Sequence, residues 1–154
     1  LPYFTASGGG VTASGGEPLL QAEFLLVLFK KLKSLNIHTA IDTSGYADVE
    51  KAKALLKYTD LVLLSIKHAD PDKYPDICGA KSDRPRAFAR YLTKIDKPVW
   101  IRYVVIPGLT DDQHSLDQIN AWVKTMNNVV KLELLPYHTM GVYKWEQLGI
   151  PYTL

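Results

Sequence analysis

The sequence predicts an α/β protein whose parallel strands form an open or partial barrel, with a doubly wound sheet as the second choice. Short apolar runs, typical of buried strands, alternate with longer segments of helical periodicity. The alternation occurs four times before a last strand, and strands joined by helical crossovers lie parallel. Five strands are too many for a hairpin fold and too few for a closed eight-stranded barrel.

The first strand is expected at residues 10–14. A helix follows it from Pro18, because proline suits the first turn of a helix. Apolar side chains recur there at helical spacing, at Leu20, Phe24, Val27, Leu28, Leu32 and Leu35. Asn36 ends the helix, and residues 37–42 form the second strand.

The same alternation predicts the other elements. A helix over residues 48–58 leads to an almost unbroken apolar strand at 61–66, the pattern expected where helices cover both faces of a parallel sheet. A proline-rich loop at 70–83 precedes a helix that ends near residue 94. The last elements are a strand at 99–106, a helix that begins with a capping box at Thr110–Gln113 and ends near residue 126, and a strand at 129–135.

Composition excludes several classes of protein. With 47% hydrophobic and 22% charged residues, the 154-residue chain has the composition of a globular domain. A net charge of +2 gives no reason to expect nucleic acid or an acidic membrane as a partner, and no apolar run reaches the length of a membrane span. The single cysteine, Cys78, excludes an internal disulfide framework and suits the cytoplasm. The chain lacks an initiator methionine and stops in a turn-rich stretch, so we expect residues 1–154 to be one domain truncated at both ends.

Ligands of parallel α/β folds bind at the carboxyl ends of the strands, so the residues there form the candidate site. An acid, a lysine, an arginine and a histidine fall at these ends, which a purely structural barrel would not need. The candidate residues are Gly15, Gly16, Glu17, Asp42, Ser65, Ile66, Lys67, Arg102 and His138. Simpler roles stay open for three of them: Asp42 as a loop cap, Lys67 as a solvated strand end and His138 as a surface histidine. Arg102 lies in an apolar strand, so we expect it to pair with a carboxylate or to face a polar cavity.

The glycine-rich stretch at residues 8–17 matches two phosphate-binding motifs only formally. Residues 8–13 fit G-x-G-x-x-A, but no hydrophobic strand precedes them and no helix opens directly after them. Gly10 and Gly15 have the spacing of a P-loop, yet Gly16 and Glu17 stand where lysine and serine or threonine are required. Free backbone carbonyls beside a carboxylate favour a cation instead, and a ligand ammonium group fits because it brings three donors.

The residues Gly-Gly-Glu-Pro at 15–18 resemble the S-adenosylmethionine (SAM) motif of radical SAM enzymes. Longer blocks, in order and over nearly the whole chain, resemble the radical SAM activases of glycyl radical enzymes, of the type that acts on pyruvate formate-lyase. These blocks are ASGGGVTASGGEPLLQAEF, IHTAIDTSG, TDLVLLSIKH, FARYL, VWIRYVVIPGLTDD and LLPYHTMGVYKW.

The resemblance implies a partial (β/α)6 barrel, a [4Fe–4S] cluster and SAM as cosubstrate. In this family the reduced cluster cleaves SAM to a 5′-deoxyadenosyl radical, which removes a hydrogen atom from a glycine of the partner enzyme. It implies pyruvate formate-lyase as the partner, an electron donor such as flavodoxin, and a place in anaerobic metabolism in the cytoplasm.

The resemblance also implies roles for the candidate residues. Gly15, Gly16 and Glu17 would receive the methionine ammonium of SAM, and Ser65, Ile66 and Lys67 would lie against SAM. His138 would contact the adenosyl end, Asp42 would place the ribose or a nearby cation, and Arg102 would face the cavity. No residue of the chain is expected to be catalytic or to ligate a metal.

Two departures from the family pattern set limits. The C-x3-C-x2-C loop that binds the cluster is absent, and Cys78 cannot replace it, so these 154 residues alone are expected to hold no cluster and to do no radical chemistry. Ser65 stands where the family commonly has aspartate, so a weaker dependence on a monovalent cation is expected. The alternatives are an inert SAM- or partner-binding fragment and, less favoured, a Schiff-base lyase that uses Lys67.

Overall fold

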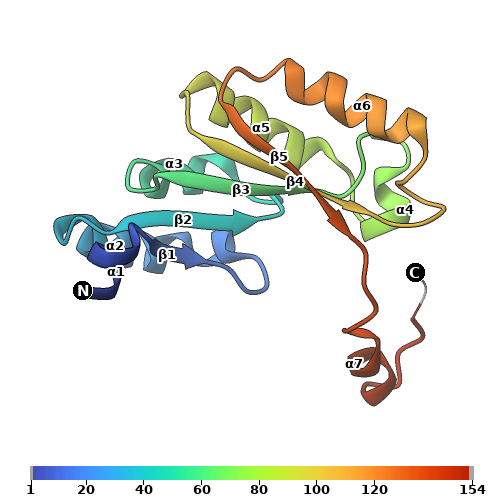
Figure 1. The fold of residues 1–154 in the computed structure, drawn as a ribbon, viewed down its shortest axis with the longest axis horizontal. Helices are drawn as coiled ribbons and strands as arrows, with labels where there is room; N and C mark the ends of the chain where they lie inside the picture. Colours follow the sequence, from blue (N-terminus) through green and yellow to red (C-terminus); the bar gives the residue numbers. More distant parts are fainter. Residues whose placement is uncertain (1, 153–154) are drawn as a thin grey trace.

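The computed structural model describes residues 2–152, except the side chains of Tyr3 and Thr5. A single sheet of five parallel strands forms its centre, and the strand order equals the chain order (Figure 1). The strands are β1 Gly10–Ala13, β2 His38–Thr43, β3 Leu61–Ile66, β4 Val99–Val105 and β5 Val129–Pro136. The predicted parallel α/β architecture is confirmed. Because doubly wound sheets reverse their strand order at a switch point, the sequential order excludes that second choice.

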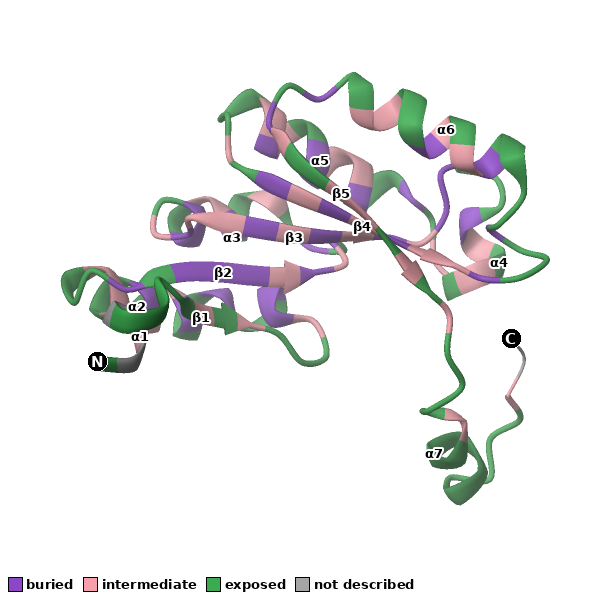
Figure 2. Cartoon of the chain, in the orientation of Figure 1, coloured by how far each residue is buried: buried purple, intermediate pink, exposed green. Residues whose placement is uncertain are grey.

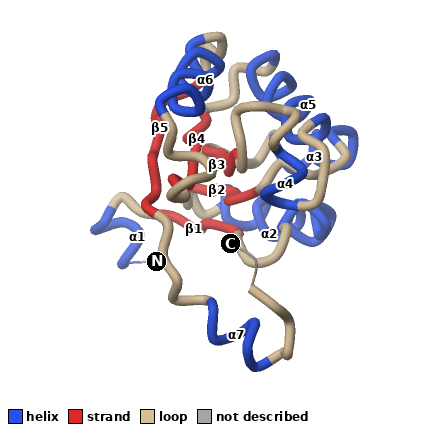
Figure 3. Tube along the Cα trace, turned by 90° about the vertical axis from the view of Figure 1, so that its right-hand side faces the viewer, coloured by secondary structure: helices blue, strands red, loops and turns tan. Residues whose placement is uncertain are grey.

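The helices are α1 Pro2–Ser7, the 3-10 helix η1 Pro18–Gln21, α2 Ala22–Ser34, α3 Val49–Leu56, α4 Tyr74–Cys78, α5 Asp83–Lys94, α6 Gln113–Lys124 and α7 Val142–Gln147. Helices α2 to α6 lie on one side of the sheet, whereas α1 and α7 lie apart from them (Figure 3). Helices α1, α4 and α7 were not predicted. Helix α4 has only five residues and lies in the stretch expected to be a proline-rich loop. Pro75 takes a first-turn position in it, and Gly79 ends it at φ 66°.

On the inner strands β3 and β4, alternate residues face the helices and are buried (Figure 2). On β3 these are Val62, Leu64 and Ile66, whereas Leu61 and Leu63 are only half-buried on the opposite, concave face. The prediction that helices cover both faces of the sheet is therefore wrong. An apolar strand is equally compatible with one helix-covered face and one face that lines a cavity.

The first long helix turns only part of its predicted apolar face toward the core, since Leu28 and Leu32 pack against the core but Leu20, Phe24 and Val27 do not. In and before α2 the buried residues are Pro18, Leu19, Ala22, Leu25 and Phe29. Leu20, Phe24 and Val27 are 79%, 63% and 70% exposed. Two apolar stripes run along this segment at helical spacing, so periodicity alone could not identify the stripe that faces the core.

The start of α6 also differs from the prediction. The N-cap residue is Asp112, whose Oδ1 accepts a hydrogen bond from the backbone N–H of Ser115 at 3.0 Å. Thr110 is fully buried, and its hydroxyl donates to the carbonyl of Val104 and accepts from the N–H of Ile106, both at 2.7 Å. The threonine thus fastens the loop after β4 instead of forming a capping box.

Candidate functional site

The turn after β1 presents glycine backbone at the carboxyl end of the sheet. Gly15 adopts φ 114°, a conformation that L side chains rarely reach, so the position requires glycine. A Cβ atom added to Gly15 or Gly16 would meet no other atom within 4 Å, so the space in front of both residues is open. The turn can therefore bring its backbone groups close to a ligand.

The carboxylate of Glu17 is occupied by the protein itself. Its Oε1 accepts from the backbone N–H of Leu19 at 3.1 Å and from Thr43 Oγ1 at 2.6 Å. Its Oε2 accepts from the N–H of Ser44 at 3.0 Å and from Ser44 Oγ at 2.6 Å. Each oxygen has its usual two partners. Glu17 therefore ties the turn after β1 to the end of β2, and the glycine carbonyls, rather than this carboxylate, are left for a ligand.

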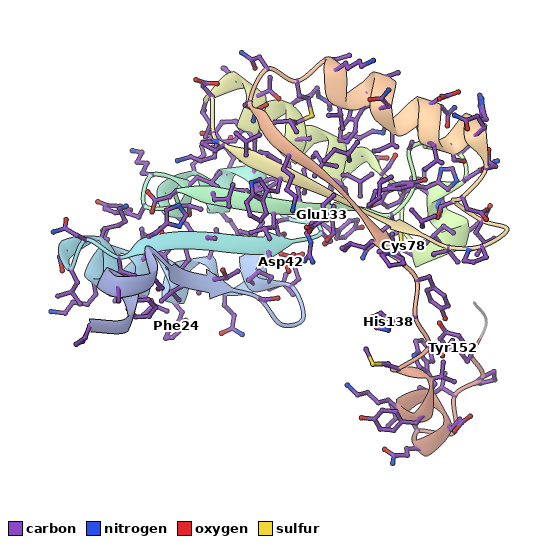
Figure 4. All side chains as sticks on the ribbon, viewed as in Figure 1. Phe24, Asp42, Cys78, Glu133, His138 and Tyr152 are labelled. Carbon is purple, nitrogen blue, oxygen red and sulfur yellow. The ribbon has the colours of Figure 1, made fainter. Side chains whose placement is uncertain are left out.

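Arg102 crosses the concave face between two carboxylates. Its Nη1 donates to Asp42 Oδ2 on β2 at 2.9 Å, and its Nε donates to Glu133 Oε2 on β5 at 3.1 Å. Asp42 and Glu133 lie close together in the view with side chains (Figure 4). Since β3 lies between β2 and β4, the guanidinium reaches across it, and the β3 residue paired with Arg102 is the small Ser65. The expectation that Arg102 pairs with a carboxylate is confirmed.

The sequence prediction missed Glu133. Besides its bond from Arg102, Glu133 accepts a hydrogen bond from Lys131 Nζ at 2.6 Å. The hydrogen bond from Lys131 lowers the pKa of Glu133, partial burial opposes this, and the charges of Lys131 and Arg102 lower it further. The available signal was the alternation of two charges, Lys131 and Glu133, with apolar residues in the last strand.

Lys67, just after β3, lines a separate small cavity of about 230 Å³ at the carboxyl end of the sheet. The other lining residues are Ser44, Tyr46, Tyr74, Cys78 and Ala80. Burial raises the pKa of Tyr74 to about 12, so its hydroxyl stays neutral. Within residues 2–152, the ammonium of Lys67 has no ion pair. Lys67 is therefore available to an anionic group of a ligand.

Two other candidate residues, Ile66 and His138, do not present their side chains beside Arg102 and Asp42. The Ile66 side chain is 4% exposed and packs in the core on the helix side, so only its backbone can face a ligand. His138 is exposed and lies beyond the end of β5, clear of Asp42 and Glu133 (Figure 4). Between residues 2 and 152 the structure contains no group of three histidine, cysteine or acidic side chains that could hold a metal ion. Nor does this part of the chain contain a helix that is long and apolar enough to cross a membrane.

Comparison with known proteins identifies the fold family. The sequence profile of the radical SAM superfamily matches residues 5–119. The chain belongs to this superfamily. Its five parallel strands are those of the radical SAM partial barrel, as expected, and the superfamily uses SAM together with a [4Fe–4S] cluster.

Several relatives of this radical SAM chain carry one functional name. It is 50% identical over 99% of its length to the pyruvate formate-lyase-activating enzymes of Staphylococcus epidermidis (strain ATCC 12228) and Staphylococcus aureus (strain USA300). The chain spans 63% of the length of these relatives. A crystal structure of a domain of pyruvate formate-lyase-activating enzyme from Bacteroides vulgatus superposes with a TM-score of 0.77 at 27% identity, over 94% of this chain and 98% of that one.

A more distant structure confirms the fold alone. Streptococcus suis SuiB bound to S-adenosylmethionine gives a TM-score of 0.69 at 20% identity, over 91% of this radical SAM chain and 33% of SuiB. None of these relatives favours the Schiff-base lyase or the inert binding fragment.

Proposed function

We propose that residues 1–154 are the SAM-binding core of an enzyme that activates pyruvate formate-lyase by generating a glycyl radical. The observation that carries this proposal is the 50% identity to two staphylococcal pyruvate formate-lyase-activating enzymes over 99% of the chain. The open glycine turn, Asp42 and Lys67, which lines its own small cavity, each lie near the carboxyl end of a strand, where ligands of such folds bind.

The charges of the rim suit SAM, which carries an ammonium, a sulfonium and a carboxylate. In this proposal the carbonyls of Gly15 and Gly16 and the carboxylate of Asp42 receive the ammonium end, and Lys67 binds the carboxylate. Glu17 holds the turn in place through its four hydrogen bonds. Ser65 and the backbone of Ile66 line the floor, Arg102 faces the cavity, and His138 meets the adenosyl end. When bound together with a [4Fe–4S] cluster, SAM would supply the radical chemistry that removes a hydrogen atom from glycine.

The cluster itself does not fit the residues present. A site of this kind requires three thiolates, and residues 1–154 contain one cysteine, Cys78, which is exposed at the end of α4. The proposal therefore places the cluster ligands in sequence beyond residues 1–154. It further assigns pyruvate formate-lyase as the protein substrate, an electron donor such as flavodoxin, and the cytoplasm as the compartment, without a nucleic-acid or membrane partner.

The proposal is tested by electron paramagnetic resonance. The natural gene product is reconstituted anaerobically with iron and sulfide, reduced, and mixed with SAM and pyruvate formate-lyase. A glycyl radical signal that requires all components is expected. Gly16→Ala should abolish most of this signal while the protein stays folded, because the new methyl group enters only the open space in front of the turn.

A matched control uses Gly141→Ala, which also adds a methyl group in open space but on the distant α7 end. This variant should give the wild-type signal. Residues 1–154 purified alone should bind no iron after the same reconstitution. A reconstituted natural gene product that leaves pyruvate formate-lyase without a radical would refute the proposed function.

A further inference from the structure

Four charged side chains of alternating sign run across the concave face from β5 to β2. Lys131 Nζ lies 2.6 Å from Glu133 Oε1, Glu133 Oε2 lies 3.1 Å from Arg102 Nε, and Arg102 Nη1 lies 2.9 Å from Asp42 Oδ2. This charge row, defined as Lys131, Glu133, Arg102 and Asp42, joins the edge strand β5 to the strand beside the glycine turn. Its side chains are about a quarter exposed, except Lys131, which is 46% exposed.

The hydrogen bonds of Arg102 to Glu133 and to Asp42 depend on each other geometrically. A guanidinium group is planar, so a bond from Nε to Glu133 fixes the plane in which Nη1 can point. In this plane Nη1 meets Asp42. Without Glu133 the long side chain would regain rotamers that do not reach across β3. Glu133 on β5 therefore determines the position of a group that contacts β2.

Asp42 is in turn left with one free oxygen. Its Oδ2 is bound by Arg102, whereas its Oδ1 has no hydrogen-bond partner among residues 2–152. Both oxygens of Glu17 already have two partners each. Of the two carboxylates Glu17 and Asp42, only Asp42 therefore keeps an oxygen, Oδ1, that is open to a cationic ligand. The bond from Arg102 to Oδ2 sets the orientation of this carboxylate.

The charges around Arg102 also indicate that it orients Asp42 and does not itself bind an anionic ligand group. Its single positive charge faces two carboxylates at hydrogen-bonding distance, so it is already compensated. Lys67, with no ion pair in the described part of the chain, is the better anchor for an anionic group.

We propose that Glu133 is a positioning residue for ligand binding: acting through Arg102, it orients Asp42 toward the cationic amino-acid end of SAM. The edge strand β5 thereby controls affinity at the opposite side of the sheet. This inference rests on the proposed function for the identity of the ligand, but the linkage between Glu133 and Arg102 can be measured without any ligand.

The binding test compares two ligands in the natural gene product by isothermal titration calorimetry. Glu133→Gln should weaken SAM binding about tenfold or more, the loss expected for one charge-assisted hydrogen bond. Binding of 5′-methylthioadenosine, which lacks the amino-acid end, should change less than about twofold. In an Asp42→Asn background the same substitution should have no further effect on SAM, because Glu133 acts through Asp42. Glu50→Gln, which removes a carboxylate from the exposed ion pair with Lys53, is the matched control and should bind both ligands as the wild type does.

The second test needs no ligand. Nitrogen-15 NMR of arginine-labelled protein should show separate, slowly exchanging guanidinium signals for Arg102 in the wild type and averaged signals in Glu133→Gln. Signals that stay separate in Glu133→Gln would overturn the inference. So would an equal loss of affinity for SAM and 5′-methylthioadenosine, or effects of Glu133→Gln and Asp42→Asn on SAM affinity that simply add. A wild type that binds no SAM but shows the NMR change would refute the proposed function and leave the linkage intact.

Discussion

Glu17 and Ser44 are joined by two hydrogen bonds, in which the backbone N–H and the hydroxyl of Ser44 both donate to Oε2 of Glu17. Twenty-seven residues separate them in the chain. The bonds hold the glycine turn after β1 against the end of β2, so the carboxylate of the Gly-Gly-Glu motif has a clear role in the structure before any ligand is considered.

Glu17→Gln should lower the free energy of unfolding by about 1–3 kcal/mol, because the amide nitrogen would face hydrogen-bond donors and leave them unsatisfied. Urea denaturation of the natural gene product measures this. Glu23→Gln, on the exposed side of α2, is the control and should change stability by less than about 0.5 kcal/mol. Equal stability of the two variants would contradict the structural role of Glu17.

Gly10→Ala should destabilise the sheet at its β1 edge. A Cβ atom at this position would collide with the backbone carbonyl of His38, its partner on β2, and backbone cannot move aside as a side chain can. A cost of about 1–3 kcal/mol is expected, as for other overpacked sites. Gly141→Ala meets no atom within 4 Å and serves as the control. A melting temperature for Gly10→Ala equal to that of the control would show that β1 does not pair with β2 as described.

Phe29 and Phe24 should differ sharply in their contribution to stability. Phe29 is fully buried, so Phe29→Ala should cost about 3–5 kcal/mol through lost burial and a cavity. Phe24 is 63% exposed on the same helix, and Phe24→Ala should cost less than about 0.5 kcal/mol. Chemical denaturation of both variants decides which stripe of α2 faces the core. The reverse order would mean that the stripe through Leu20 and Phe24 is the buried one.

Asp60 should make stability depend on pH in the acid range. Burial raises the pKa of Asp60, but hydrogen bonds from Lys33 and Thr39 outweigh it and hold the pKa below its ordinary value of 3.8. Its stabilising contribution is therefore complete above pH 3.8 and is lost as the pH falls through the lower folded-state pKa.

Asp60→Asn should accordingly be less stable than the wild type by about 1–3 kcal/mol at pH 7, and the difference should shrink below pH 4. Asp76→Asn, at an exposed position of α4, is the control and should follow the wild type at every pH. A wild-type advantage that is independent of pH would contradict the role of the ionised carboxylate.

Strand β3 could be predicted from the sequence because Leu61–Ile66 is an almost unbroken apolar run, and the end of β4 because Pro107 and Gly108 follow it closely. The buried face of α2 could not, because Leu20, Phe24 and Val27 repeat the spacing of the stripe that is buried. The candidate residues at the strand ends followed from the rule that ligands bind there. Their pairing did not: the bond of Arg102 to Asp42 joins residues 60 positions apart, and the alternation of charges in the last strand does not by itself show that Glu133 is the second partner.

The identity of strand order and chain order has a consequence for synthesis on the ribosome. Every strand pairs only with the strand before it and the strand after it, so no pairing has to wait for a segment made much later. The sheet can grow by one strand and one helix at a time as the chain emerges, N-terminal part first. Each finished strand leaves one unpaired edge, and the next strand to be translated is the one that covers it.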